Sequence, residues 1–229
     1  MDEQEQAVII ASTAGHTQSI EKKQNILDAA ERLFGEVGFE AVSTRQLAKE
    51  AGVNMAMLSY YFGSKEKLFE AMILRRIEEG RTRLAQIVLS NMGPQDKICA
   101  VIDYYVDKTF GAGRMHSIFF REISLNQRSD VSGLICSSYL RNMEDVSNII
   151  REGEDRHIFK KVDKELTILM IISTISHVVN SQNMSRRIFD IPANELVNER
   201  EDVKERIKIH LKDVILSYLS IKPHTTLKP

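Results

Sequence analysis

Residues 43–62 constrain this chain more than any other stretch, because they specify two short helices joined by a tight turn. Ser43 is a good N-cap residue, and Gln46 can reach back to its amide to form a capping box. Gly52 can adopt the positive φ that ends a helix, and Asn54 is a second N-cap. This pattern is typical of a helix-turn-helix, whose second helix can lie in a DNA major groove.

The sequence on both sides narrows the interpretation, because two short helices alone would fit any helical protein. A longer amphipathic helix precedes them, and Ser64 can cap another long helix after them. Three motifs follow one another: A-A-E-R-L-F-G-E-V-G-F, S-T-R-Q-L-A-K-E-A-G-V and L-S-Y-Y-F-G-S-K-E-K-L. From about residue 20 to residue 72 the sequence resembles the N-terminal domain of the TetR family of transcriptional regulators. The remainder shows only a generic helical pattern.

Every other segment with a regular apolar pattern is also predicted to be helical. No alternating pattern bounded by hairpin turns is present in the sequence. The other predicted helices cover residues 19–37, 64–91, 94–110, 115–126, 130–153, 163–185 and 199–219. We therefore expect an all-α fold. The resemblance implies a three-helix DNA-binding head joined by a long fourth helix to a helical ligand-binding and dimerisation body.

These elements predict four parts along the chain. Residues 1–18 are expected to form a flexible N-terminal arm, with a short helix packed on the body as the alternative. Residues 19–66 are the expected helix-turn-helix domain, residues 67–222 the effector-binding and dimerisation domain, and residues 223–229 a C-terminal tail. At 1.5 Å per residue the fourth helix would be a rod of roughly 40 Å.

Charge gives no support of its own to a nucleic-acid partner. The net charge is −1, and residues 21–67 contain seven basic and seven acidic side chains. DNA-binding domains usually have a basic footprint. Here such a footprint has to come from the placement of the basic residues, because they are not in excess.

Cysteine content and the start of the chain indicate the cellular compartment. Cys99 and Cys136 have no metal-ligand spacing and are expected to be buried reduced thiols. The first five residues are acidic, unlike a signal peptide, and no apolar run reaches the ~18 residues that span a bilayer. We expect a cytoplasmic protein without a membrane partner.

The resemblance implies a set of DNA-contacting residues in the head. Arg45 matches a position that reaches a base edge in some members, with a solvated helix residue as the alternative. Ser43 and Thr44, at the start of the same helix, match positions that contact phosphates in the family. Lys65, at the start of the fourth helix, and the adjacent Tyr60 and Tyr61 also match phosphate-contacting positions. The full predicted set is Ser43, Thr44, Arg45, Asn54, Met55, Ala56, Met57, Ser59, Tyr60, Tyr61 and Lys65.

The second helix of the motif departs from the family pattern. Family members often carry a polar or basic residue, a threonine and a tyrosine where this chain has Met55, Met57 and Ser59. Methionines cannot donate hydrogen bonds, so they would read thymine methyl groups and groove shape. Alternatively, Met55 packs under Leu58 in the core, whereas Met57 points away and is harder to explain as a core residue.

The family resemblance also implies an effector site in the body. Ligand sites in helical bundles lie between helices and combine apolar walls with a few polar groups. For each candidate taken singly, core packing is the alternative. The predicted set is Tyr104, Tyr105, His116, Phe120, Tyr139, Met143, Met170, Thr174 and His177.

The last two long helices are predicted to form a homodimer interface. Each carries an apolar stripe at helical spacing, and two such helices per subunit would make a four-helix bundle about a two-fold axis. An intramolecular core is the alternative. The predicted interface residues are Ile168, Ile172, Ile175, Val179, Val203, Ile207, Leu211, Val214 and Tyr218.

The expected function is that of a homodimeric, ligand-responsive repressor that binds a near-palindromic operator and is released by a small apolar or amphipathic effector. An enzyme is not expected, and no catalytic residue, cofactor or metal is predicted. Di-iron bundles need two Glu-x-x-His motifs, and the chain has one, from Glu154 to His157. No H-E-x-x-H, phosphate-binding loop or G-x-S-x-G element is present. The alternative is a helical carrier of an apolar ligand without specific DNA binding.

Overall fold

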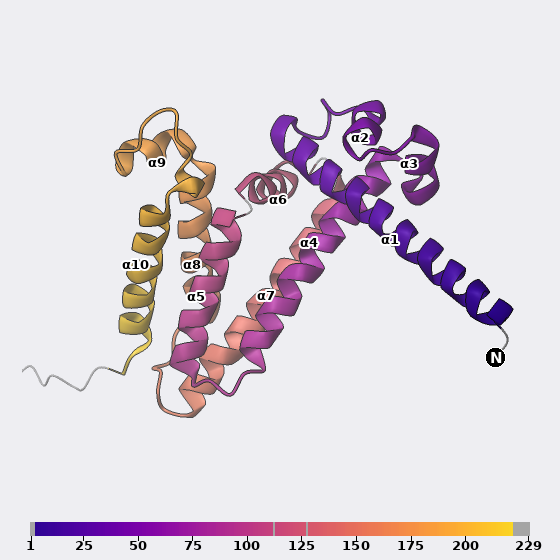
Figure 1. Ribbon diagram of the computed structural model, residues 1–229. Coiled ribbons are helices and arrows are strands. Elements are labelled where there is room, and N and C mark those ends of the chain that lie inside the picture. The colour runs from indigo at the N-terminus through magenta and orange to yellow at the C-terminus, as the bar shows by residue number, and fades with distance from the viewer. Residues whose placement is uncertain (1–2, 112, 127, 222–229) are drawn as a thin grey trace, which may run out of the picture. The chain divides into compact units, whose positions relative to one another are not determined.

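The computed structural model describes residues 3–111, 113–126 and 128–221, and within these ranges it is all-α, as predicted (Figure 1). The helices are α1 (Glu3–Val37), α2 (Thr44–Glu50), α3 (Met55–Phe62), α4 (Lys65–Val88), α5 (Pro94–Gly111), α6 (Gly113–Leu125), α7 (Ser129–Asp155), α8 (Lys164–Asn180), α9 (Gln182–Ile188) and α10 (Glu201–Leu219), with a 3₁₀ turn at Val197–Glu199. None of the described helices is both long and apolar enough to span a bilayer.

The chain divides into two compact units, Met1–Arg76 and Ile77–Pro229. The division falls inside α4, whereas the predicted domain boundary, between residues 66 and 67, lies near the start of that helix. The predicted C-terminal tail, residues 223–229, lies outside the described residues.

Unit 1 is built around a cluster of aromatic rings. The ring centroids of Phe34, Phe39 and Phe69 lie 5.0 to 5.4 Å apart, a spacing typical of favourable tilted and edge-on aromatic pairs. Apolar residues of every helix in the unit are buried with them, including Leu47 on α2 and Leu58 on α3. This core brings α1, α2, α3 and the start of α4 together.

The first helix begins earlier than its pattern predicted. It was expected to start at residue 19 after a flexible arm, but α1 is helical from Glu3. The physical reason is that residues 3–18 contain no proline and a single glycine, so no residue there prevents the helix from starting before residue 19.

A second difference concerns the helix predicted over residues 163–185. It breaks at Ser181 into α8 and α9. The Gln182 side chain donates a hydrogen bond to the Val179 carbonyl at 2.8 Å and accepts one from the Val197 amide at 3.0 Å. These contacts satisfy the end of α8 and hold the following loop, a tertiary role that helical periodicity does not show.

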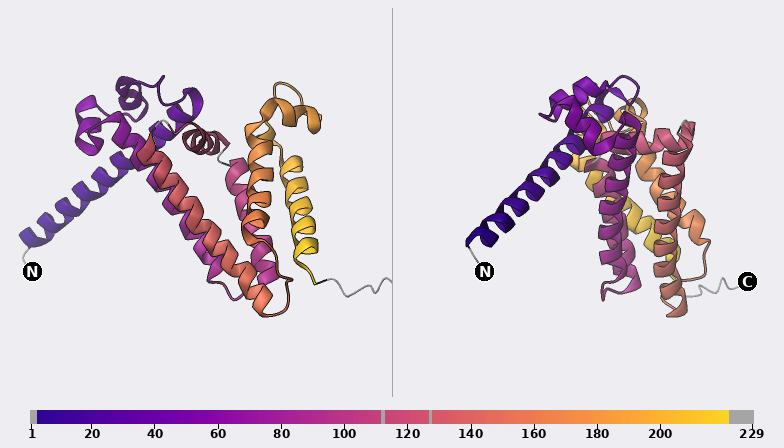
Figure 2. Two further views of the ribbon diagram at one scale, coloured as in Figure 1. Left: turned by 180° about the vertical axis from the view of Figure 1, so that it is seen from behind. Right: turned by 90° about the vertical axis from the view of Figure 1, so that its right-hand side faces the viewer.

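Unit 2 is a helical bundle in which α5 contacts α7, α8 and α10 (Figure 2). Its core runs along these four helices and contains mainly isoleucine and valine, with Leu84 from the second half of α4. The Phe159 ring, 3% exposed, lies against Gly153 of α7, where a side chain would overlap the ring. The absence of a side chain at Gly153 therefore allows the segment after α7 to fold back against this helix.

We expect Gly153→Ala to destabilise the protein by about 1–3 kcal/mol, because the new methyl group has to displace the buried Phe159 ring. Urea denaturation followed by circular dichroism measures the change. Gly133→Ala is the matched control on the same helix. Its added methyl meets nothing within 4 Å, so it should leave the stability unchanged or raise it by up to about 1 kcal/mol. Equal effects of the two substitutions would contradict this account.

Candidate DNA-binding site

The start of α2 is fixed by the predicted capping box. The Ser43 hydroxyl accepts a hydrogen bond from the Gln46 amide at 3.2 Å, and the Gln46 side chain accepts one from the Ser43 amide at 2.8 Å. Thr44 is half-buried and Arg45 is exposed. The start of α2 therefore combines a helix N-terminus with an exposed guanidinium, a combination suited to phosphate oxygens.

The turn between the two helices also follows the prediction. Gly52 has a φ of +65°, and the Val53 amide donates to the Ala48 carbonyl at 2.9 Å. Asn54 caps α3 by accepting a hydrogen bond from the Met57 amide at 2.8 Å. These contacts fix the direction in which α3 leaves the turn.

One face of α3 is buried and the other is open. Leu58 and Phe62 enter the core of unit 1. The outward face carries Met55, Ala56, Ser59 and Tyr60, and all four are exposed. Most of the predicted contacts on this helix thus share one accessible surface.

The two methionines differ from expectation. Met55 is 52% exposed, so the alternative in which it packs into the core under Leu58 is wrong. Met57 was expected to point away from the core, but it is half-buried at the edge of the outward face. Because α3 has only eight residues, a small tilt of the helix against the core is enough to cover one side of its outward face, where Met57 lies.

Tyr60 and Tyr61 were predicted together as phosphate contacts, but their environments differ. Tyr60 is 84% exposed. Tyr61 is half-buried, and its hydroxyl forms a 3.1 Å hydrogen bond with that of Ser19 on α1. Their rings pack edge-on at 5.3 Å between centroids. Tyr60 is therefore free to contact a ligand, whereas Tyr61 connects α3 to α1.

Lys65 has a structural role that the sequence did not indicate. Its ammonium donates hydrogen bonds to the carbonyls of Phe39 and Val42, at 3.1 and 3.0 Å, and lies 4.2 Å from the centroid of the Phe39 ring. These contacts hold the loop before α2 against the start of α4. Its predicted phosphate contact would have to use the third ammonium proton.

The placement of ion pairs shows how a segment with equal numbers of basic and acidic side chains, residues 21–67, can still present positive charge. Arg32 pairs with Glu50, and Arg75 with Asp28 and Glu31. Arg45 and Lys49, both exposed on α2, have no acidic partner within the part of the chain that the structure describes. Positive charge is thus available on α2. Lys49 was missed by sequence reasoning, although its place in the last turn of α2 could have drawn attention to it.

In unit 2, the structure brings together part of the predicted effector set. Tyr104 and Tyr105 on α5 are both 8% exposed, with ring centroids 5.2 Å apart, and Tyr139 and Met143 are half-buried on α7. The Tyr104 hydroxyl donates a 2.8 Å hydrogen bond to the Gly80 carbonyl of α4. Burial raises the pKa of Tyr104 to about 12, so this phenol stays protonated and can donate.

His116 connects α6 to α8. Its Nε2 lies 3.0 Å from the Ser176 hydroxyl, and the adjacent Ser117 hydroxyl donates to the Asn180 side chain at 3.1 Å. Burial, with a smaller contribution from the charge of Lys108, lowers the pKa of His116 to about 4. Sequence reasoning missed Ser176 and Asn180, although their spacing of four residues on α8 places them on one face.

The other predicted effector residues do not line the interior of unit 2. Phe120 is 53% exposed, Met170 is 39% exposed, and His177 is also exposed. Thr174 is half-buried, and its hydroxyl donates to the Met170 carbonyl in the preceding turn. The predicted semi-polar face of α8 therefore turns towards solvent, because the isoleucines on the other side fill the core.

The predicted dimer stripe is also corrected. Its members Ile168, Ile175, Val179, Val203, Ile207 and Leu211 belong to the core of a single chain, which was the alternative. Ile172 and Val214 are half-buried, and Tyr218 is 42% exposed. Helical spacing shows that α8 and α10 each have an apolar face, but it does not show whether that face meets α5 or a second subunit.

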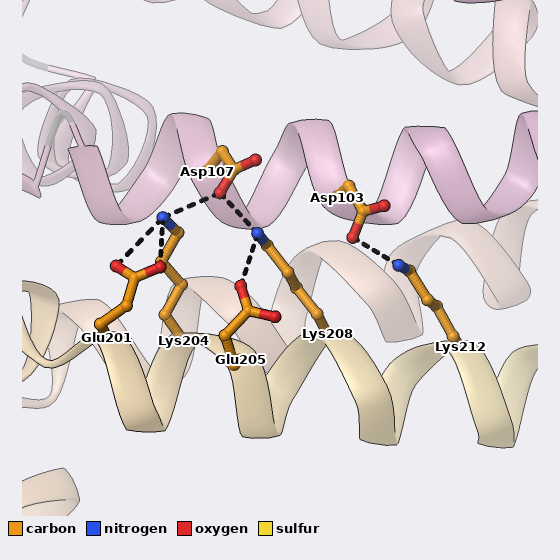
Figure 3. Close-up of polar contacts among 7 residues, drawn as sticks. All are labelled: Asp103, Asp107, Glu201, Lys204, Glu205, Lys208 and Lys212. Carbon is orange, nitrogen blue, oxygen red and sulfur yellow. Dashed lines mark hydrogen bonds and ion pairs between the residues drawn. The ribbon is translucent and has the colours of Figure 1, made fainter.

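A row of ion pairs fixes which face of α10 meets α5 (Figure 3). Lys204 and Lys208 lie 3.0 and 2.9 Å from Asp107, and Lys212 lies 2.7 Å from Asp103. Burial alone would raise the pKa of Asp107, but the hydrogen bonds from Lys208 and Lys204 hold it below its usual value. The pairs flank the apolar stripe, so they orient α10 on α5.

We expect His116 to make the stability of the protein depend on pH. Its folded-state pKa is depressed, so its contribution is complete above pH 6.5 and is lost as the pH falls from 6.5 towards about 4. At pH 5 this loss is at most about 2 kcal/mol. In His116→Gln, the decrease in unfolding free energy between pH 7 and pH 5 should be smaller than in the parent protein. An unaltered decrease in His116→Gln would contradict this account.

Sequence comparisons agree with this geometry. The model for "Bacterial regulatory proteins, tetR family" matches residues 26–72. The probable HTH-type transcriptional regulator YttP of Bacillus subtilis (strain 168) is 26% identical over 160 residues, covering 68% of this chain and 76% of YttP. The HTH-type transcriptional regulator BetI of Brucella suis biovar 1 (strain 1330) is 38% identical over 82 residues, covering 35% of this chain and 41% of BetI. The chain thus spans about three-quarters of YttP but less than half of BetI.

Solved structures share the fold over most of both chains. The TetR family transcriptional regulator PfmR from Thermus thermophilus has a TM-score of 0.65 at 20% identity, covering 86% of this chain and 99% of PfmR. FadR from Bacillus subtilis in complex with stearoyl-CoA has a TM-score of 0.64 at 18% identity, covering 86% and 98%. The family match and the helix-turn-helix geometry show that residues 26–72 belong to the TetR family of DNA-binding transcriptional regulators, which are not enzymes, and the solved structures show that the chain as a whole shares their fold.

Proposed function

We propose that this regulator is a cytoplasmic, homodimeric repressor that binds a near-palindromic operator and is released by a small amphipathic effector. The observation that carries the proposal is the open face of α3, together with the exposed Arg45 and Lys49 on the neighbouring helix α2. A helix with one face anchored in the core and the other exposed is suited to enter a major groove. Two copies about a two-fold axis would read two half-sites.

The effector would bind in unit 2, where the buried tyrosines, His116 and Met143 combine apolar surface with neutral hydrogen-bonding groups. These rings and the thioether would contact the apolar part of an amphipathic molecule, while the Lys108 ammonium, 5.6 Å from the centroid of the Tyr104 ring, is a charged group beside them. FadR from Bacillus subtilis, which shares the fold, binds stearoyl-CoA, a molecule of this kind. The hydrogen bond from Tyr104 to Gly80 would transmit a displacement of α5 to α4.

The dimer surface is proposed on the outward side of α8 and α10, because their inward stripes are already buried. Leu166, Leu169 and Met170 on α8 are 63, 44 and 39% exposed, and Ile209 on α10 is 68% exposed. Burying such side chains between two subunits would stabilise the dimer, since they gain nothing from contact with water.

The operator is tested by selecting bound duplexes from a random DNA pool at ~150 mM salt, where nonspecific electrostatic binding is weakened. A two-fold-symmetric motif is expected. Absence of any enriched motif, also after removal of co-purified small molecules, would contradict the repressor and favour a carrier of an apolar ligand.

On the selected operator, we expect Arg45→Ala to weaken binding by about 1–3 kcal/mol if Arg45 contacts a base edge, with little change on random DNA. Lys49→Ala is the matched control on the same helix. As a phosphate contact it should weaken binding to both DNAs equally and reduce the salt dependence. Titrations followed by fluorescence anisotropy separate the two results, and equal loss on both DNAs in Arg45→Ala would make Arg45 a phosphate contact.

We expect Leu169→Glu to convert the dimer into a monomer, because the two-fold axis would bring two new carboxylates to one apolar surface. Size-exclusion chromatography with light scattering gives the mass. Leu140→Glu, at a 66% exposed leucine of α7, is the control and should remain dimeric. A dimeric Leu169→Glu protein would exclude this face of α8.

A further inference from the structure

The outward face of α3 has an unusual composition for a surface that meets DNA bases. The helix reads Met55-Ala56-Met57-Leu58-Ser59-Tyr60-Tyr61-Phe62 and contains no charged side chain. Its only polar side-chain groups are the hydroxyls of Ser59, Tyr60 and Tyr61, and the last of these is hydrogen-bonded to Ser19. Any base recognition by α3 has to use the groups that remain.

Each base pair requires different chemistry in the major groove. Guanine is read mainly by paired donors of arginine or lysine, adenine by asparagine or glutamine, and cytosine by a carboxylate. None of these residue types lies within α3. Asn54 precedes the helix, and the hydrogen bond that its side-chain oxygen accepts from the Met57 amide holds this side chain in the helix cap.

Thymine is the base that the apolar groups of this face can recognise. Its C5 methyl group is an apolar feature of the major groove, and apolar side chains contact it. Met55 is 52% exposed, and the neighbouring Ala56 is also exposed. A flexible thioether can follow the position of a methyl group, and an exposed methionine gains free energy when it leaves water for such a contact.

We propose that α3 recognises thymine methyl groups, so that each operator half-site is thymine-rich where α3 enters the groove. Met55 is the principal contact, Ala56 adds a second methyl group, and Met57 borders the surface. Guanine is expected only towards the edge of the half-site, opposite Arg45 on α2. The inference rests on the proposed function, because it requires a specific operator.

The test removes the methyl groups one at a time. After the operator has been selected with the full chain, each thymine of a half-site is replaced by uracil, which lacks the C5 methyl group but keeps the same hydrogen-bonding groups. Fluorescence anisotropy at ~150 mM salt gives the affinity of each duplex. Each contacted methyl group should contribute about fourfold, the effect of burying one methylene-sized group, and uracil outside the α3 contact should have no effect.

Protein variants then assign each methyl group to a side chain. Met55→Ala should abolish the preference for thymine over uracil at one position of the half-site, and Met57→Ala should leave that preference intact or alter a neighbouring position. Lys49→Ala serves as the control, because it should weaken binding to both duplexes and preserve the thymine preference. Circular dichroism confirms that the variants are folded.

The outcomes separate this inference from the proposed function. A symmetric operator with guanine and cytosine at the positions facing α3, or one insensitive to uracil, would overturn thymine recognition and leave the repressor intact. A uracil effect that persists at every position in both methionine variants would overturn the assignment to methionine. No operator at all would contradict the proposed function itself.

Discussion

Two side-chain oxygens, those of Ser43 and Asn54, determine where α2 and α3 begin, and the recognition surface depends on both. Each accepts a hydrogen bond from a backbone amide that has no partner within its helix. With these starts fixed and Gly52 at positive φ, Leu58 and Phe62 reach the core together. The opposite side of α3 is then open to DNA.

In unit 2, ion pairs determine which face of a helix is buried. The three lysines of α10 pair with Asp103 and Asp107 beside a stripe of buried isoleucine, valine and leucine (Figure 3). The apolar stripe supplies the favourable burial, and the charges specify which side of α10 is used. Because the isoleucines of α8 also face this core, the leucines on its other side are exposed, and the surface proposed for a second subunit follows from the packing of the first.

Local rules were sufficient for most of the head. The capping box, the turn glycine and both N-caps are short-range features, and all are confirmed. Predictions that depended on the partner of a side chain were less successful. Lys65 resembles a phosphate contact in sequence, and the sequence did not show that its ammonium also binds carbonyl groups more than twenty residues away in the chain. The break after α8 likewise depends on a glutamine that contacts a distant amide.

The sequence by itself determined the helical fold, the helix-turn-helix and the chemical character of its outward face. These depend on periodicity, caps and residue types, which act over four or five residues. Only the tertiary structure decided that Met55 is open, that Tyr61 is tied to α1, and that the stripes of α8 and α10 are buried within one chain. The physical reason is that an apolar face specifies burial but does not specify its partner, and that partner is selected by packing and charge across the whole unit.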